Sequence, residues 1–127
     1  MGGPSVVVQP GITIGILTLH GSTASPNSAP DCSKAVNLLN KTTIDGKKKL
    51  ASDPAFSLAA QLLGAKLNVV AGAGVCPAAE EAIEKAQSLL AAIKFNGLTH
   101  ATMTSSQITQ AHKLETTLNN YNNNLLC

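Results

Sequence analysis

The sequence predicts a mainly α-helical protein, an antiparallel four-helix bundle with an N-terminal β arm or hairpin. After residue 31, apolar side chains recur at steps of three and four residues, which places them on one face of a helix. Residues 5–19 differ, because they are apolar and rich in β-branched side chains. We therefore divide the chain into an N-terminal β arm and linker, residues 1–30, and a helical bundle domain, residues 31–127.

The arm is expected to form a hairpin or two extended strands. Pro10 and Gly11 suit the central positions of a type II turn, and residues 21–30, GSTASPNSAP, are typical of a linker. A lone two-stranded hairpin is marginal in water, and its unpaired edges are templates for another chain. The arm should therefore bury its apolar side chains on a neighbouring copy or, alternatively, fold back on its own helices. These side chains are Val6, Val7, Val8, Ile12, Ile14, Ile16, Leu17 and Leu19.

The first helix is expected over residues 31–40. Asp31 lies at its start, where the helix dipole favours a carboxylate. Three side chains spaced by four and three residues should form its inner face: Cys32, Val36 and Leu39. A connection over residues 41–52 follows and turns at Asp45-Gly46.

The second helix, within residues 53–74, is the longest apolar periodic run. Asp53 can accept hydrogen bonds from the first free N–H groups, and Pro54 suits the first helical position. Gly72 and Gly74 permit the left-handed conformation that ends a helix. Its inner face is expected to comprise Phe56, Ala59, Leu63, Leu67 and Val70, and is widened by Ala60 and Leu62.

The third and fourth helices follow the same logic. The third begins at Pro77 and ends at Asn96-Gly97, and the fourth starts near Thr104, where Gln107 completes a capping-box pattern. The inner face of the third is Ala79, Ile83, Ala86, Leu90 and Ile93. The stripe of the fourth is Ile108, Ala111, Leu114, Leu118, Tyr121 and Leu125. Four amphipathic helices with short to moderate connections predict an up-down-up-down bundle.

The three cysteines should lie at one end of such a bundle. Cys32 starts the first helix, Cys76 precedes the third and Cys127 follows the fourth. The last two helices would each be ~27–31 Å long at 1.5 Å per residue, so Cys76 and Cys127 should face each other. We expect a disulfide there, the alternative being three reduced thiols. Cys32 is then left over, which makes it a candidate for an intermolecular disulfide.

Composition and motifs point away from catalysis and from nucleic acids. All nine basic residues are lysine, and their one run, residues 47–49, is typical of a solvated turn. His20, His100 and His112 lie in different predicted elements, and the chain has no HExxH, CxxC or phosphate-loop motif. We therefore expect no catalytic residue, no metal site and no cofactor. No apolar run reaches the ~20 residues that a membrane-spanning helix needs, so we expect no membrane insertion.

Three segments together resemble a poorly characterised family of bacterial secreted or cell-surface helical domains: ASDPAFSLAAQLLGAKLN, GAGVCPAAEEAIEKAQSLL and TLNNYNNNLLC. Domains of that family often end in a similar YNN-LC tail. The resemblance covers residues 31–127 and does not include the arm. It implies export and half-cystines at Cys76 and Cys127, with Cys32 a weaker match. It implies no catalytic activity.

These observations predict a non-enzymatic structural protein of the extracellular space or the cell surface. Its expected partners are other copies of itself, because an arm that adds to or packs across the next copy builds a filament when the contact does not close. The alternative is a monomeric cell-surface binding or adhesion module. With two Phe, one Tyr and no Trp, the chain has few of the aromatic side chains that usually anchor interfaces.

Overall fold

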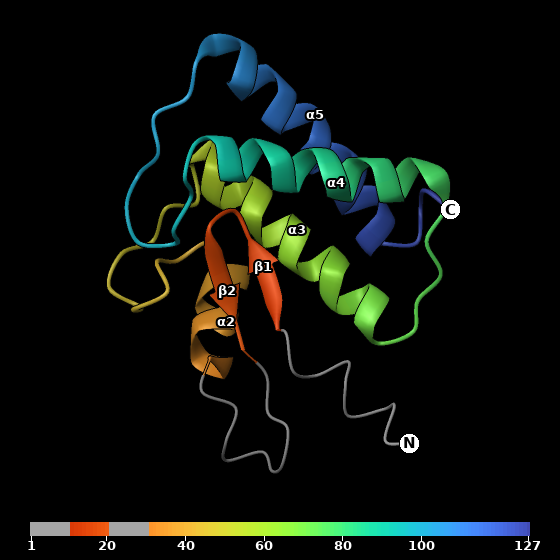
Figure 1. Ribbon diagram of the computed structural model, residues 1–127, viewed down its shortest axis with the longest axis horizontal. Coiled ribbons are helices and arrows are strands. Elements are labelled where there is room, and N and C mark those ends of the chain that lie inside the picture. Colours follow the sequence, from red (N-terminus) through yellow and green to blue (C-terminus); the bar gives the residue numbers. More distant parts are fainter. Residues whose placement is uncertain (1–10, 21–30) are drawn as a thin grey trace.

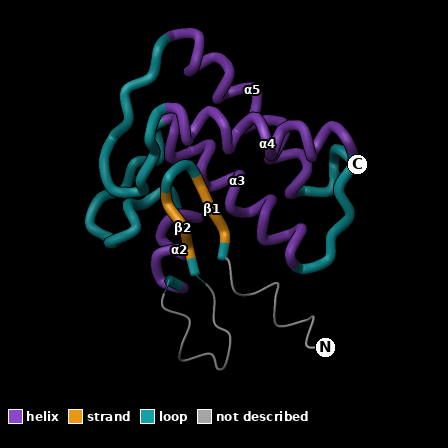
Figure 2. The backbone as a smooth tube through the Cα atoms, viewed as in Figure 1, coloured by secondary structure: helices purple, strands orange, loops and turns teal. Residues whose placement is uncertain are grey.

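The computed structural model of the chain describes residues 11–20 and 31–127, and this part is mainly helical (Figure 1). Its elements are a hairpin of strands β1 (Ile12–Ile14) and β2 (Leu17–Leu19) and the helices α2 (Cys32–Leu39), α3 (Pro54–Val70), α4 (Pro77–Ala92) and α5 (Ser105–Asn122). The predicted helical class is confirmed, and a hairpin lies near the N-terminus as expected (Figure 2). Its turn is at Gly15-Ile16, however, inside a stretch expected to form one strand, and not at the predicted Pro10-Gly11. Val6, Val7, Val8 and the predicted linker lie outside the described residues.

Helix α3 lies at the centre of the described part and contacts α2, α4, α5 and β1. Nine of its side chains between Ala55 and Ala65 are buried, including Ala60 and Leu62, which widen the apolar face as predicted. A closed four-helix bundle also requires the first helix to touch the fourth. Among the described elements, α2 contacts only α3 and β2, so the closed ring of helix contacts is not present at α2.

The two ends of α3 differ in burial. Asp53 caps the first turn by accepting a hydrogen bond from the Ala55 N–H at 2.9 Å, as predicted, and Phe56 packs edge-on against Phe95 with ring centres 4.9 Å apart. At the other end the predicted inner face is wrong, because Leu67 and Val70 are 37% and 63% exposed. The last turn of α3 borders an open groove, described below, instead of another element.

The hairpin pairs Ile12 with Leu19, Thr13 with Thr18 and Ile14 with Leu17. Because side chains alternate along a strand, this register places the aliphatic side chains on one face and the two threonines on the other. Gly15, with φ +65°, takes the first central position of the two-residue turn, where a type II′ turn places glycine. The aliphatic face packs against the helices, and Ile14 and Leu19 are 0% and 5% exposed.

Hydrogen bonds fix the tip of the hairpin to α4 and the loop after it. The Gln87 side chain accepts from the Gly15 N–H at 3.0 Å and donates to the Gly15 carbonyl at 2.9 Å. The Ile16 N–H donates to the Phe95 carbonyl at 3.0 Å. The described half of the arm therefore folds back on its own helices, although the Ile16 side chain, which the fold-back arrangement should have buried, is 58% exposed.

Helix α2 presents a different face from the predicted one. Asp31 is 7% exposed and accepts a hydrogen bond from the His20 N–H at 2.6 Å, which orients the start of the helix toward the hairpin. The inward positions are therefore Ala35 and Leu38, four and seven residues after Asp31. The predicted inner face is wrong, because its three members are exposed: Cys32, Val36 and Leu39.

Helices α4 and α5 agree more closely with the predictions. Thr104 and Gln107 form the predicted capping box, in which each side chain bonds the backbone of the other residue. The buried positions include Ala79, Ala86 and Leu90 on α4, and Ala111, Leu114, Leu118 and Tyr121 on α5. Leu125, expected in the α5 stripe, lies beyond the end of the helix and is 74% exposed.

Candidate functional site

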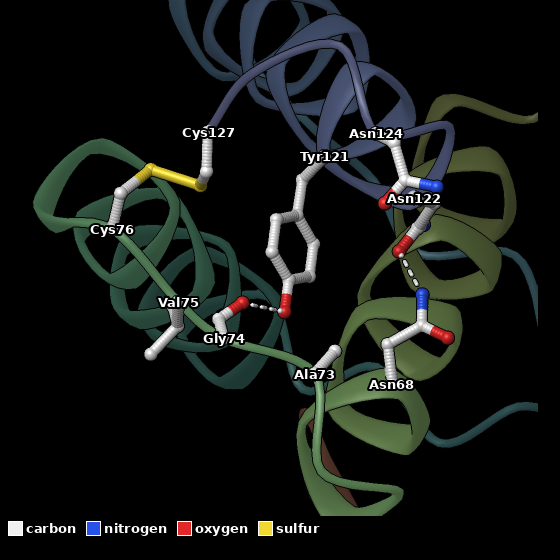
Figure 3. Close-up of a pocket in the computed structure, with 9 residues that line it drawn as sticks. All are labelled: Asn68, Ala73, Gly74, Val75, Cys76, Tyr121, Asn122, Asn124 and Cys127. Atoms are coloured by element: carbon white, nitrogen blue, oxygen red, sulfur yellow. Dashed lines mark hydrogen bonds between the residues drawn. A yellow bond between two sulfur atoms is a disulfide. The ribbon is translucent and has the colours of Figure 1, made fainter.

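The predicted disulfide joins Cys76, at the N-terminus of α4, to Cys127, after the end of α5 (Figure 3). Their Cα atoms are 5.7 Å apart, and the bond confirms the predicted pairing. Cys32 carries an exposed free thiol. Since α2 contacts neither α4 nor α5 in the described part of the chain, Cys32 lies apart from the disulfide (Figure 1). The expectation that all three cysteines share one end is wrong for Cys32.

A polar pocket of about 570 Å³ lies beside the disulfide (Figure 3). Its walls come from the end of α3, the loop from Ala73 to Cys76 and the end of α5. Tyr121 projects from α5 across the pocket and donates its hydroxyl hydrogen to the Gly74 carbonyl at 2.8 Å. The disulfide and this hydrogen bond therefore hold one loop against α5 at two neighbouring points.

Asparagine side chains form the rest of the pocket. Asn68 donates to the Asn122 amide oxygen at 2.9 Å, and Asn122 donates to the Gln61 backbone and side-chain oxygens at 3.1 and 2.9 Å. Gly64 leaves room for this packing, because a Cβ there would lie 3.2 Å from the Asn122 amide nitrogen. Asn124 also lines the pocket, and its side chain has no hydrogen-bond partner among the residues that the structure describes.

Neither Asn68 nor Asn122 was among the site residues predicted from the sequence. A signal was present in the spacing, since Asn122 follows the buried Leu118 by four residues and so continues the apolar stripe of α5 with a polar side chain. A polar residue at such a position requires hydrogen-bond partners when it is covered. The partners come from α3, which periodicity within α5 could not identify.

A second concave surface, the β1 groove, lies between β1, the last turns of α3 and the start of α4. It has a volume of about 440 Å³ and includes Ile12, Val69, Val70, Val75 and Ile83. Val69, Val70 and Val75 are 38%, 63% and 41% exposed. Exposed aliphatic side chains that lie together make this groove a candidate interaction surface, whereas single ones are normal.

Lys66 forms one wall of the β1 groove. Its ammonium group donates to the Thr13 carbonyl at 2.7 Å. Burial lowers the pKa of Lys66, because the charged form loses hydration. Thr13 belongs to the middle pair of a hairpin with a two-residue turn, so its backbone groups point away from β2. Lys66 therefore occupies the outward carbonyl at this strand edge and limits strand addition there.

The predicted arm residues separate into distinct groups. Ile14 and Leu19 belong to the core, and Ile12 and Leu17 are partly buried against it. Ile16 faces solvent at the hairpin tip. Val6, Val7 and Val8 precede Gly11, which lines the β1 groove, and are outside the described residues.

Two histidine–aspartate pairs tie loops to helix starts. His100 Nδ1 lies 2.5 Å from an Asp53 carboxylate oxygen, while the other oxygen of Asp53 caps α3. His20 Nδ1 lies 3.0 Å from Asp31. Within residues 11–20 and 31–127, no three His, Cys, Asp or Glu side chains gather closely enough to hold a metal ion. These pairs have a structural explanation, because both aspartates occupy the N-cap position of a helix, although only the Asp53 side chain accepts hydrogen bonds from the first turn.

Comparison of the chain with family models, with curated proteins and with solved structures finds no match. Of the helices that the structure describes, none combines the length and the hydropathy required to cross a bilayer.

Proposed function

We propose that the chain is a non-enzymatic structural protein of the extracellular space or cell surface, whose copies self-assemble into filaments through the N-terminal arm. The observation that supports this most is the β1 groove, where Val69, Val70 and Val75 present apolar surface to solvent next to the first described residue, Gly11. The Cys76–Cys127 disulfide supports an oxidising compartment, since such bonds persist mainly outside the cytosol. We expect no nucleic-acid partner.

The structure narrows the part of the arm that can act between copies. Ile14 and Leu19 are in the core of their own subunit, and Gln87 holds the hairpin tip. Removing the hairpin would therefore damage the fold as well as any assembly. The segment left for contact with a neighbour is the run Val6–Val8, whose side chains are as apolar as the groove.

Cys32 offers a second link between copies. Its thiol is exposed on α2, at helical spacing from the exposed Val36 and Leu39. Two such thiols from two copies would form an intermolecular disulfide by exchange with a small-molecule disulfide, which is reduced to two thiols. No described residue of the β1 groove comes from α2, so this bond would reinforce a separate contact.

The test compares the full chain with a variant in which Val6, Val7 and Val8 are all replaced by serine. We expect the full chain to form elongated particles in negative-stain microscopy and a mass that rises with concentration in light scattering. The serine variant should remain monomeric. A matched control replaces the exposed Leu98 and Leu125, which lie outside the groove, and should assemble normally. A full chain that stays monomeric, or a serine variant that assembles like the full chain, contradicts the proposal.

The alternative is a monomeric surface module that binds a neutral polar ligand in the asparagine-lined pocket. The specific observation is that the side chains of the lining include three asparagine amides and a tyrosine but no carboxylate, imidazole or amine. Amides donate and accept hydrogen bonds, as the hydroxyl groups of a sugar do. Binding of neutral oligosaccharides on a glycan array, lost on Asn124→Ala and retained on Asn96→Ala, would support this alternative. An array without any binding would contradict it.

A further inference from the structure

We propose that the β1 groove is the acceptor for residues Val6–Val8 of a second copy of the chain, an inference that rests on the proposed self-assembly and names its contact. The groove faces solvent along Val69, Val70 and Val75, with the partly buried Ile12 and Ile83 in its walls. Covering these side chains removes apolar surface from water, which favours association.

The chemistry of the groove fits this segment. Residues 1–10, MGGPSVVVQP, contain no charged side chain and three consecutive valines. The groove's one ammonium group, on Lys66, is already bonded to the Thr13 carbonyl. Its carboxylates, on Glu80 and Glu84, belong to exposed residues of α4, and neither has a basic partner among the described residues. An uncharged aliphatic segment brings no charge of its own to this surface.

The hairpin register excludes a tight, strand-paired return of the same chain along β1. For a chain to return along its own β1 by a two-residue turn at Pro10-Gly11, Gln9 would have to pair with Ile12. In the β1–β2 hairpin, the pair next to the turn, Ile14 and Leu17, exchanges backbone hydrogen bonds. Bonded and non-bonded pairs alternate along the strands, so the N–H and C=O groups of Ile12 both point to Leu19. The tight return is therefore not available. Exchange of a terminal segment between copies avoids it, and head-to-tail exchange that does not close gives a filament.

Because Lys66 occupies the outward carbonyl of Thr13, the contact is side-chain packing more than strand pairing. Val70 is then the most informative acceptor position, since it is the most exposed aliphatic residue of the groove and a substitution there leaves the core intact. Val36 on α2 provides a matched control, because it is the same residue type, is 50% exposed and lies outside the groove.

The experiment uses full-length protein with Cys32→Ser, to which Val7→Cys is added with either Val70→Cys or Val36→Cys. Under oxidised glutathione, the variant with cysteines at positions 7 and 70 should give a ladder of cross-linked oligomers in non-reducing gels, and reductant should remove it. The variant with cysteines at positions 7 and 36 should give at least tenfold less cross-linked oligomer. Peptide mapping of Cys76–Cys127 and circular dichroism verify folding. A separate Val70→Lys variant should need at least tenfold more protein to assemble, and Val36→Lys should not.

Three results overturn this contact. A cross-link between positions 7 and 70 that is confined to monomers would place the segment in the groove of its own subunit. Equal cross-linking of the two pairs would show that the groove is not specific. Assembly of the wild-type protein, combined with no cross-link between positions 7 and 70 in the Val7→Cys/Val70→Cys variant, would reject the groove and leave the proposed function standing. A wild-type protein that never assembles rejects the proposed function itself.

Discussion

Tyr121 and Gly74 are joined by a hydrogen bond of 2.8 Å from the phenol to the backbone carbonyl, directly beside the disulfide of Cys76. Tyr121 is 6% exposed, so its hydroxyl has little contact with water. Tyr121→Phe should lower the free energy of unfolding by about 1 kcal/mol, the usual net value of such a bond. Urea denaturation measures this change. An unchanged midpoint would show that the disulfide alone holds the loop.

Loss of the disulfide should have a larger effect. Cys76 and Cys127 are 51 residues apart, and in the chain-entropy model closing a loop of that size stabilises a fold by about 4 kcal/mol. The double variant Cys76→Ser/Cys127→Ser should lose roughly this amount in chemical denaturation. Cys32→Ser is the matched control and should leave stability unchanged, because its thiol is exposed and unbonded. If the wild type, the double variant and Cys32→Ser were equally stable, the entropic argument would be contradicted.

Gly15 should not tolerate a side chain. Its φ is +65°, and a Cβ would lie 2.7 Å from the Phe95 carbonyl oxygen. Gly15→Ala should therefore cost at least about 1–2 kcal/mol, the strain of the left-handed conformation before any clash. Gly74→Ala is the control, because a Cβ there meets nothing within 4 Å. Thermal unfolding compares the two, and similar melting temperatures would mean that the hairpin tip is not held against α4.

Asp31 should make stability depend on pH. Its pKa lies below the ordinary value, chiefly because the carboxylate accepts the His20 backbone N–H, with further bonds from the His20 ring and Lys34, while burial opposes the shift. A lowered carboxyl pKa stabilises the fold above the unfolded pKa of about 3.9, and this contribution is lost as pH falls through the folded pKa. Asp31→Asn should cost on the order of 1 kcal/mol at pH 7. Chemical denaturation at pH 7 and pH 3 should show that the difference in the free energy of unfolding between the wild type and Asp31→Asn is smaller at pH 3. A difference that is the same at both pH values contradicts the linkage.

Local signals in the sequence identified much of the fold. The caps at Asp53 and Thr104 act within one turn of the chain, so their residue types alone predicted where α3 and α5 begin. The Cys76–Cys127 pair could also be placed, because both cysteines flank helices of similar length that run antiparallel. Each of these inferences needed only neighbouring residues or a simple count along the chain.

The errors came from contacts between distant segments. The apolar periodicity of α2 is compatible with two inner faces that differ by about one residue. The hydrogen bond between Asp31 and His20, which lie on either side of the predicted linker, determines which face is buried. The end of α3 looked as apolar as its beginning, yet no described element covers Val70. The candidate sites were unpredictable for the same reason. Asn68 and Asn122 meet only because α3 and α5 pack together, and Thr13 meets Lys66 only because the hairpin folds back.

The position of the disulfide also determines how the protein would carry a mechanical load. Tension applied between Gly11 and Cys127 passes through the sulfur atoms to Cys76, so α4 and α5 are excluded from the stretched path. At ~3.4 Å per extended residue, the 51 residues of the closed loop withhold ~170 Å of extension until the bond is reduced. Pulled between Gly11 and Cys127, an oxidised chain would lengthen only through the residues before Cys76, and α4 and α5 would stay unloaded.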